Sequence, residues 1–165
     1  MPIRFRIRVI APSKSAFYYD KWVREIESKM RTKTEPDLRK YFKDTIIGWK
    51  TQPEFLAHHF KTNSSIGVQV YTSNRVYGIV NAGSPSHLIR PRQRGGILRF
   101  QVGYQSATKL GSLKSGPYRR SGITVTTLQV RHPGFKPRGF DELIADDYSP
   151  KFVKDMYETF TGGLP

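Results

Sequence analysis

The chain has 165 residues, no cysteine and a formal net charge of +15. Its length suits one domain with its own core, and the lack of cysteine excludes disulfides and thiol chemistry. No apolar run approaches the ~18 residues of a membrane helix and no signal peptide is present, so we expect synthesis in the cytosol and no membrane association. The surplus of lysine and arginine predicts an acidic partner, either nucleic acid or an acidic protein surface.

The charges are unevenly distributed along the chain. Residues 55–140 contain no Asp or Glu, yet they carry 13 of the 28 lysines and arginines and all 4 histidines. Residues 1–54 are mixed in charge, and residues 141–165 are acidic. Two interpretations of the basic block stay open: a solvated face that happens to lack acids, or a surface that meets an acidic partner.

The first third of the chain predicts one strand followed by two helices. Residues 3–9 alternate apolar side chains with arginine, the period of a strand whose polar face is solvated or laid against something acidic. Residues 15–31 and 34–49 have apolar side chains at helical spacing, and the second run opens with a proline in its first turn. We expect the second helix to stop near Pro53, so that residues 1–52 form a strand and a helical hairpin.

After Pro53 the apolar period changes to that of strands. Residues 55–61 and 66–71 predict a β-hairpin, because four polar turn-forming residues join them. Residues 75–81 suit a short helix or an extended crossing. We further expect three strands, the first two paired with each other: residues 87–90, 97–102 and 123–131.

The last two segments complete the predicted fold. Residues 103–121 are polar, basic and rich in glycine without periodicity, which predicts a mobile loop. Residues 140–160 carry a broad apolar stripe typical of a helix, and Pro150 should kink or split it. The fold class is therefore α+β: a small antiparallel sheet, contributed by residues 53–139, packed by N-terminal helices and a C-terminal helix, with a long basic loop, in a single domain 1–165.

No constellation of residues predicts catalysis. His58 and His59 are adjacent in a strand, so their side chains point to opposite faces and cannot share a metal. His87 and His132, with arginines nearby, allow the hypothesis of a small basic ribonuclease. Both histidines, however, lie in proline-bound corners, where an imidazole usually bonds a loop carbonyl. We therefore favour a structural role, and expect neither enzyme activity nor a cofactor.

The segment that starts at Val130 is rich in proline and glycine, the residues that determine backbone geometry. Pro133 fixes its own φ and favours an extended residue before it, and Gly134 can then adopt a positive φ. Pro137 interrupts the backbone again before Phe140 opens the final helix. The pattern predicts a strand, a rigid corner and a helix start, in that order.

This corner occurs together with His87-x-Ile89-x-Pro91 and Leu98-x-Phe100 upstream. The order of these elements, over about residues 50–145, resembles the minor tail-component family of tailed bacteriophages, the neck or tail-completion proteins. The resemblance implies a structural virion protein that joins head and tail, present in the neck or tail and, during assembly, in the host cytoplasm. It also implies other neck and tail proteins as partners, and a homo-oligomeric ring, with a hexamer favoured. The motif consists of His87, Pro91, Phe100, His132, Pro133, Gly134, Pro137 and Phe140.

Nine basic residues between positions 90 and 131 form the candidate contact surface. With the resemblance, protein–protein contact inside the virion is the favoured interpretation. The alternatives are sequence-independent binding of nucleic acid, including DNA, and a solvated loop. The nine residues are Arg90, Arg92, Arg94, Arg99, Lys109, Lys114, Arg119, Arg120 and Arg131.

Overall fold

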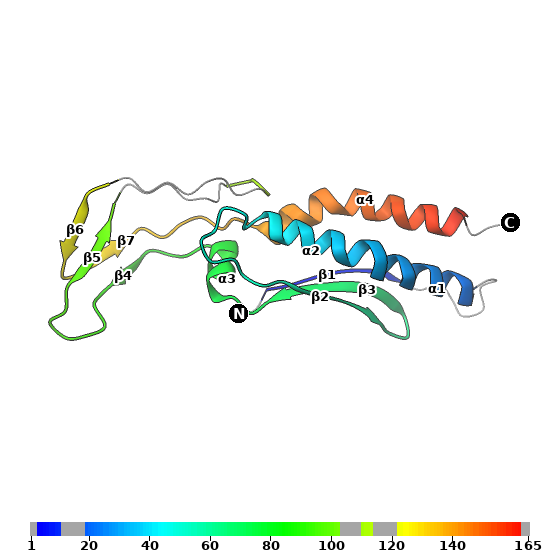
Figure 1. The fold of residues 1–165 in the computed structure, drawn as a ribbon, viewed down its shortest axis with the longest axis horizontal. Helices are drawn as coiled ribbons and strands as arrows, with labels where there is room; N and C mark the ends of the chain where they lie inside the picture. Colours follow the sequence, from blue (N-terminus) through cyan, green and yellow to red (C-terminus); the bar gives the residue numbers. More distant parts are fainter. Residues whose placement is uncertain (1–2, 11–18, 103–109, 114–121, 163–165) are drawn as a thin grey trace.

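The computed structural model describes residues 3–10, 19–102, 110–113 and 122–162. Its elements fall into two parts (Figure 1). The body consists of a three-stranded sheet and the helices, within residues 3–10, 19–83 and 136–162. The arm consists of two short ladders at one end of the body, within residues 84–102 and 122–135. The predicted α+β class is confirmed. The single small sheet expected from residues 53–139 is wrong, because the described strands form three separate antiparallel sheets and residues 3–10 supply an edge strand of the largest.

The sheet of the body has the strand order β1-β3-β2 and is antiparallel throughout. Strand β1 (Ile3–Ile10) pairs along one edge of β3 (Ser65–Thr72), and β2 (Leu56–Lys61) pairs along the other. The turn between β2 and β3 is closed by the Thr62 N–H, which donates to the Ser65 carbonyl at 2.8 Å. The predicted first strand and the predicted β-hairpin are therefore confirmed.

The predicted helical hairpin is wrong, because one helix runs from residue 19 to residue 44. It comprises α1 (Tyr19–Lys29), a π-helical turn η1 (Met30–Thr34) and α2 (Glu35–Asp44). The backbone stays in the right-handed helical region at both ends of η1, and Figure 1 shows α1 and α2 in line. The sequence pattern that predicted a new helix start marks the π-turn instead.

Pro36 offers a physical reason for that turn. A proline inside a regular α-helix has no N–H to donate, and its ring collides with the carbonyl four residues earlier. Here the residue before it, Glu35, donates its N–H to the carbonyl of Met30, five residues back. The wider π-turn therefore lies directly ahead of the proline and lets the helix continue without reversing.

The helix also ends earlier than predicted, at Asp44 rather than near Pro53. The hydroxyl of Thr45 donates to the Phe42 carbonyl at 2.7 Å, and the Ile46 N–H donates to the Lys43 carbonyl at 3.1 Å. These short-range bonds tighten the backbone into turns and compete with continuation of the α-helix.

Two asparagines set the starts of the remaining helices, α3 (Arg75–Ala82) and α4 (Phe140–Gly162). Asn74 caps α3, because its side-chain oxygen accepts the Tyr77 N–H at 2.9 Å. Asn81, at the end of α3, reaches across to accept the Phe140 N–H at 2.6 Å. Helix α4 is not split at its internal proline, contrary to one of the two outcomes that the sequence allowed.

The core of the body is aromatic and centres on the buried Tyr77. Its ring lies 4.9 Å from that of Phe55, 5.4 Å from Phe140 and 6.5 Å from Phe42, measured between centroids. Helices α1 and α2 cover one face of the sheet, and α4 packs on these helices (Figure 1). Within the described residues, no helix has the length and apolar character needed to cross a bilayer.

The arm corrects the predicted strand pairing. Its strands are β4 (His87–Ile89), β5 (Leu98–Gln101), β6 (Thr124–Thr127) and β7 (Val130–His132). β4 pairs with β7 and β5 with β6, so the expected pairing of residues 87–90 with 97–102 is wrong. The single strand expected over residues 123–131 is divided at residues 128–129, because its two halves belong to different ladders.

Candidate interaction surface

The corner predicted after Val130 joins the arm to the body. Gly134 has a φ of +81°, which confirms the predicted positive value. A Cβ at this position would lie 2.7 Å from the Pro85 carbonyl carbon and 2.9 Å from the Ser86 nitrogen. Beside it, Ser84 and Phe135 exchange both backbone hydrogen bonds, at 3.0 and 2.9 Å. Glycine is therefore required for close backbone approach as well as for its φ.

Further along the corner, Pro137 packs against the end of α3. A Cβ at Gly83, whose φ is +78°, would lie 2.7 Å from the Pro137 nitrogen. Phe140 follows and is buried, with its ring stacked on that of Tyr77. The motif residues after Gly134 thus fix the end of the arm to the body's core.

His87 and His132 face each other across the β4–β7 ladder. They are register partners, and their rings stack with centroids 5.1 Å apart. His87 Nδ1 bonds the Pro85 carbonyl at 2.9 Å, so it carries the proton, whereas His132 Nδ1 accepts the Gly134 N–H at 3.0 Å. With both Nδ1 atoms engaged by backbone, the pair fixes the corner. Among the described residues, no group of three or more His, Cys, Asp or Glu could hold a metal ion.

An apolar hollow lies between the two ladders and brings several predicted residues together. Phe100 lines it from β5 and Pro133 from the corner. Arg99 and Arg131 also line it, although they lie on different ladders. By contrast, Pro91, Arg92 and Arg94 belong to the turn between β4 and β5.

No residue of the described arm is buried, although several of its side chains are large and apolar. Ile97, Ile123 and Leu128 are 63, 78 and 69% exposed. The arm's two ladders have two strands each, and isolated two-stranded ladders are at best marginally stable. The arm therefore lacks the core that would make it stable by itself.

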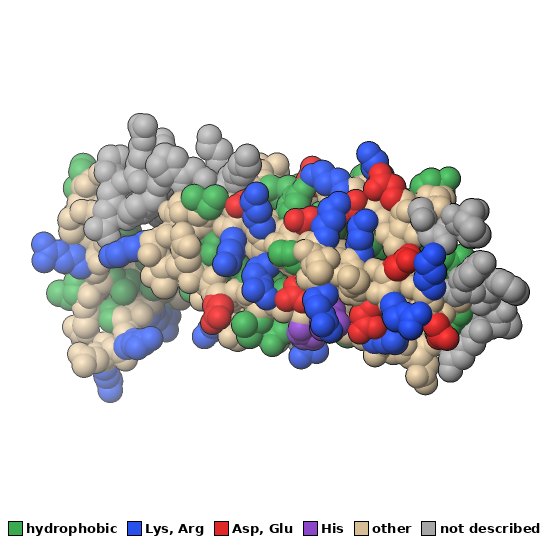
Figure 2. All heavy atoms as spheres, turned by 45° about the vertical axis from the view of Figure 1, so that its right-hand side comes forward, with side chains coloured by type: hydrophobic (Ala, Val, Ile, Leu, Met, Phe, Trp, Pro, Cys, Tyr) green, Lys and Arg blue, Asp and Glu red, His purple; other side chains and the backbone are tan. Residues whose placement is uncertain are grey.

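The arm also differs from the body in charge. It contains no Asp or Glu, and none of its described arginines forms an ion pair. On the face shown in Figure 2, acidic side chains are scattered among basic ones over the body, whereas the arm shows basic and apolar side chains. Five of the nine predicted contact residues are exposed here: Arg90, Arg92, Arg94, Arg99 and Arg131.

The other four predicted contact residues, Lys109, Lys114, Arg119 and Arg120, lie outside the described residues. The same holds for most of the predicted mobile loop 103–121, of which residues 110–113 are described. Leu113 packs against the core cluster of the body and lines a groove beside α2 and α4. At least this part of the loop therefore lies on the body rather than beyond the end of the arm.

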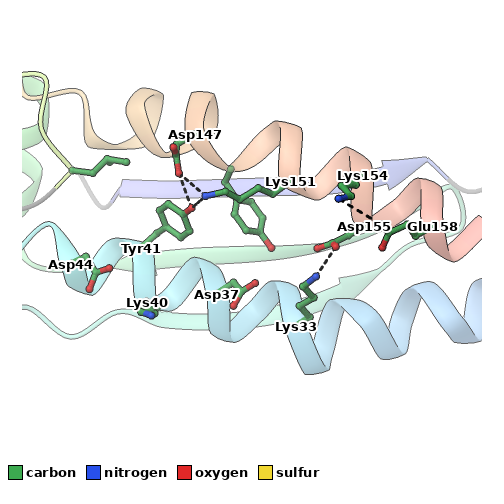
Figure 3. A pocket seen from close by; sticks show the side chains of 12 residues that line it. Lys33, Asp37, Lys40, Tyr41, Asp44, Asp147, Lys151, Lys154, Asp155 and Glu158 are labelled. Carbon is green, nitrogen blue, oxygen red and sulfur yellow. Dashed lines mark hydrogen bonds and ion pairs between the residues drawn. The ribbon is translucent and has the colours of Figure 1, made fainter.

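That groove between α2 and α4 is polar, and several of its charged side chains pair with one another across or along it (Figure 3). Lys33 bonds Asp155 at 2.5 Å. The Tyr41 hydroxyl donates to Asp147 at 2.6 Å, and Lys151 donates to both of them. We interpret these contacts as a polar clasp that holds α4 on the long helix, rather than as a binding site.

The pKa values in the clasp follow from these bonds. The hydrogen bond from Tyr41, followed by that from Lys151, lowers the pKa of Asp147. Bonds to Tyr41 and then Asp147 raise the pKa of Lys151 to about 12. Burial, followed by the bond to Asp147, raises the pKa of Tyr41. The ionised carboxylate and ammonium are thus the favoured forms near neutral pH.

The sequence analysis did not predict which side chains lie beside the arginines of β1 on the sheet. Strands β2 and β3 place aromatic side chains on the same face as these arginines, which the period of two and the strand order together would have indicated.

No family of known proteins matches the chain, and neither does any curated protein or any solved structure.

Proposed function

We propose that the protein is a structural component of a phage-type virion, acting in the neck or at the completed end of the tail. The observation that supports this proposal most is the unburied, cationic arm. An element with exposed apolar side chains, exposed arginines and no core of its own suits a surface that becomes buried against another protein. The resemblance of the corner motif to tail-completion proteins supplies the context of head–tail joining.

The same chain carries an acidic surface that could receive the arm. The first two turns of α4 contain Asp141, Glu142, Asp146 and Asp147, and the first basic residue of this helix is Lys151. The side chains of Glu142 and Asp146 are exposed. An arm placed on the α4 start of the next subunit is a head-to-tail contact, which closes into a ring when the rotation per subunit is suitable. A hexamer is the proposed ring.

The test is genetic and uses the genome that encodes the chain. Deletion of the gene should yield DNA-filled heads and separate tails, seen by electron microscopy of lysates, and a wild-type copy should restore joined particles. A copy with R92E and R94E should fold normally, because both side chains are exposed, yet fail to restore joining. Joined particles in the deletion strain would overturn the proposed function.

A matched variant distinguishes the effect of the arm from the effect of the change in net charge. R24E with K50E changes the charge equally, at exposed positions of the body. It should restore joining as the wild type does. Failure of both double variants to a similar degree would show that the arm has no special role.

The second candidate is sequence-independent binding of nucleic acid by the basic residues 90–131. The absence of carboxylates from the described arm favours it, because phosphate contacts need cations without competing acids. In this case R92E with R94E should abolish a gel shift of DNA by the purified protein. The wild-type shift should weaken steeply as salt rises.

A further inference from the structure

The sheet of the body has a second face, away from α1 and α2. Because side chains alternate along a strand, β1 contributes Arg4, Arg6 and Arg8 to this face. Their neighbours on β3 are Tyr71, Gln69 and Gly67, and the next neighbours on β2 are Leu56, His58 and Phe60. We call these nine residues the open sheet face. The opposite face, with the buried Val68 and Val70, packs into the core.

The charge of the open sheet face is entirely positive at neutral pH. The three strands contain no Asp or Glu, and the three arginine side chains are exposed. Arg6 donates to the side-chain oxygen of Gln69 at 2.7 Å, which is a neutral partner. Successive arginines on one strand face lie about 6.8 Å apart, twice the rise per residue. They form a row of cations along the edge strand.

Aromatic rings lie beside this row. A Cβ at Gly67 would lie 2.8 Å from the ring carbon Cζ of Phe60, so the missing side chain lets that ring lie across the sheet. The Arg6 guanidinium is 4.9 Å from the centroid of the Phe60 ring. On β3, the Tyr71 ring has the His58 ring at its side, 5.6 Å away. The face thus combines a row of arginines on β1 with the aromatic rings of β2 and β3.

We propose that the open sheet face binds single-stranded nucleic acid, independently of the function of the arm. The phosphates lie along Arg4, Arg6 and Arg8, and bases stack on Phe60 and Tyr71. A row of cations next to half-buried rings on a sheet is an arrangement that binds unpaired strands, because every base has a stacking face and every nucleotide a phosphate. A duplex would leave the rings unused, since its bases are already stacked.

The test measures the fluorescence anisotropy of labelled oligothymidylate with the purified full-length chain, over a range of salt concentrations. R4S with R8S leaves the Arg6–Gln69 bond in place and should lower affinity about tenfold or more. The salt dependence should fall by about 1.4 in the log–log slope, because each phosphate contact with a single strand contributes about 0.7. Circular dichroism checks that the variant is folded.

Two further variants separate stacking from charge and the sheet from the arm. F60L keeps an apolar side chain over Gly67 but removes the ring, and should lower affinity without changing the salt slope. R92S with R94S removes equal charge from the arm and should bind like the wild type. If that control lost affinity while R4S with R8S did not, the arm would be the binding site and the inference would be wrong. Absence of binding, or tighter binding of a duplex of equal length, would also overturn it.

Discussion

The body and the arm use the same chain in opposite ways. In the body, the rings around Tyr77 are buried and all the described ion pairs are found there. In the arm, no described residue is buried and no acid is present. Glycine and proline set the geometry of the arm at Gly134 and Pro133, whereas packing sets the geometry of the body.

This difference separates two sources of structural order. Burial of large side chains stabilises the body and makes its unfolding cooperative. The arm is held by its attachment to the body through the corner and by a few ladder hydrogen bonds. Such a region gains most of its remaining stability when a partner buries it, which fits a surface reserved for assembly.

The largest effect should follow from removing a core ring. Phe42 is 1% exposed, and its ring lies 5.7 Å from Phe5 and 5.4 Å from Phe55. F42A should lower the free energy of unfolding by about 3–5 kcal/mol, from lost burial and the cavity left behind. F100A, which truncates a half-buried ring of the arm, should cost about 1 kcal/mol or less. Urea denaturation of both variants measures the contrast, and equal losses would show that the arm has a core of its own.

A smaller effect is expected at the corner. G134V should cost about 1–3 kcal/mol, because valine disfavours a positive φ and its side chain meets the backbone of Ser84 and Pro85. Gly95 has a φ of +79° but no atom within 4 Å of a Cβ, so G95V isolates the cost of φ alone. Thermal melting should rank G134V below G95V. An unchanged melting temperature for G134V would contradict the tight corner.

Local rules in the sequence predicted more of the structure than long-range ones did. The alternation in residues 3–9 and the polar turn at 62–65 were sufficient for β1 and the hairpin, because period and turn chemistry are local. The φ of Gly134 followed from its neighbours in the same way. The proline at position 36 led to the wrong prediction of a second helix, since a π-turn and a new helix start look alike in sequence.

Pairing in the arm could not be read from the sequence. Residues 87–90 and 97–102 are consecutive strands with a turn between them, the usual pattern of a hairpin. Their actual partners are β7 and β6, and strands as short as β4 and β7, with three residues each, carry too little pattern to specify a partner. The sequence predicted the candidate surface as a block of basic residues without acids. That no described residue of the arm is buried could be seen only in the structure.

The smallest effect concerns the clasp between α2 and α4, where the sign of the pH dependence can be derived. The folded state lowers the pKa of Asp147 below its ordinary value of 3.8. Its contribution to stability is therefore fully present above that ordinary value, and is lost as pH falls through the lower folded-state pKa. D147N should lower the melting temperature slightly at pH 7, since it removes the charge that Lys151 and Tyr41 bond.

The neighbouring Asp146 provides the control, because it is exposed on the same turn of α4 and its carboxylate has no hydrogen bond or ion pair with any residue that the structure describes. D146N should melt like the wild type at every pH. The difference between the wild type and D147N should shrink in acid, below the ordinary pKa of aspartate, and disappear once Asp147 is protonated in the folded protein as well. Melting curves at several pH values between 7 and 2 measure this. A difference that stays constant over that range would mean that the amide is a poor replacement for reasons of shape, and that the charged clasp contributes nothing to holding α4 on the long helix.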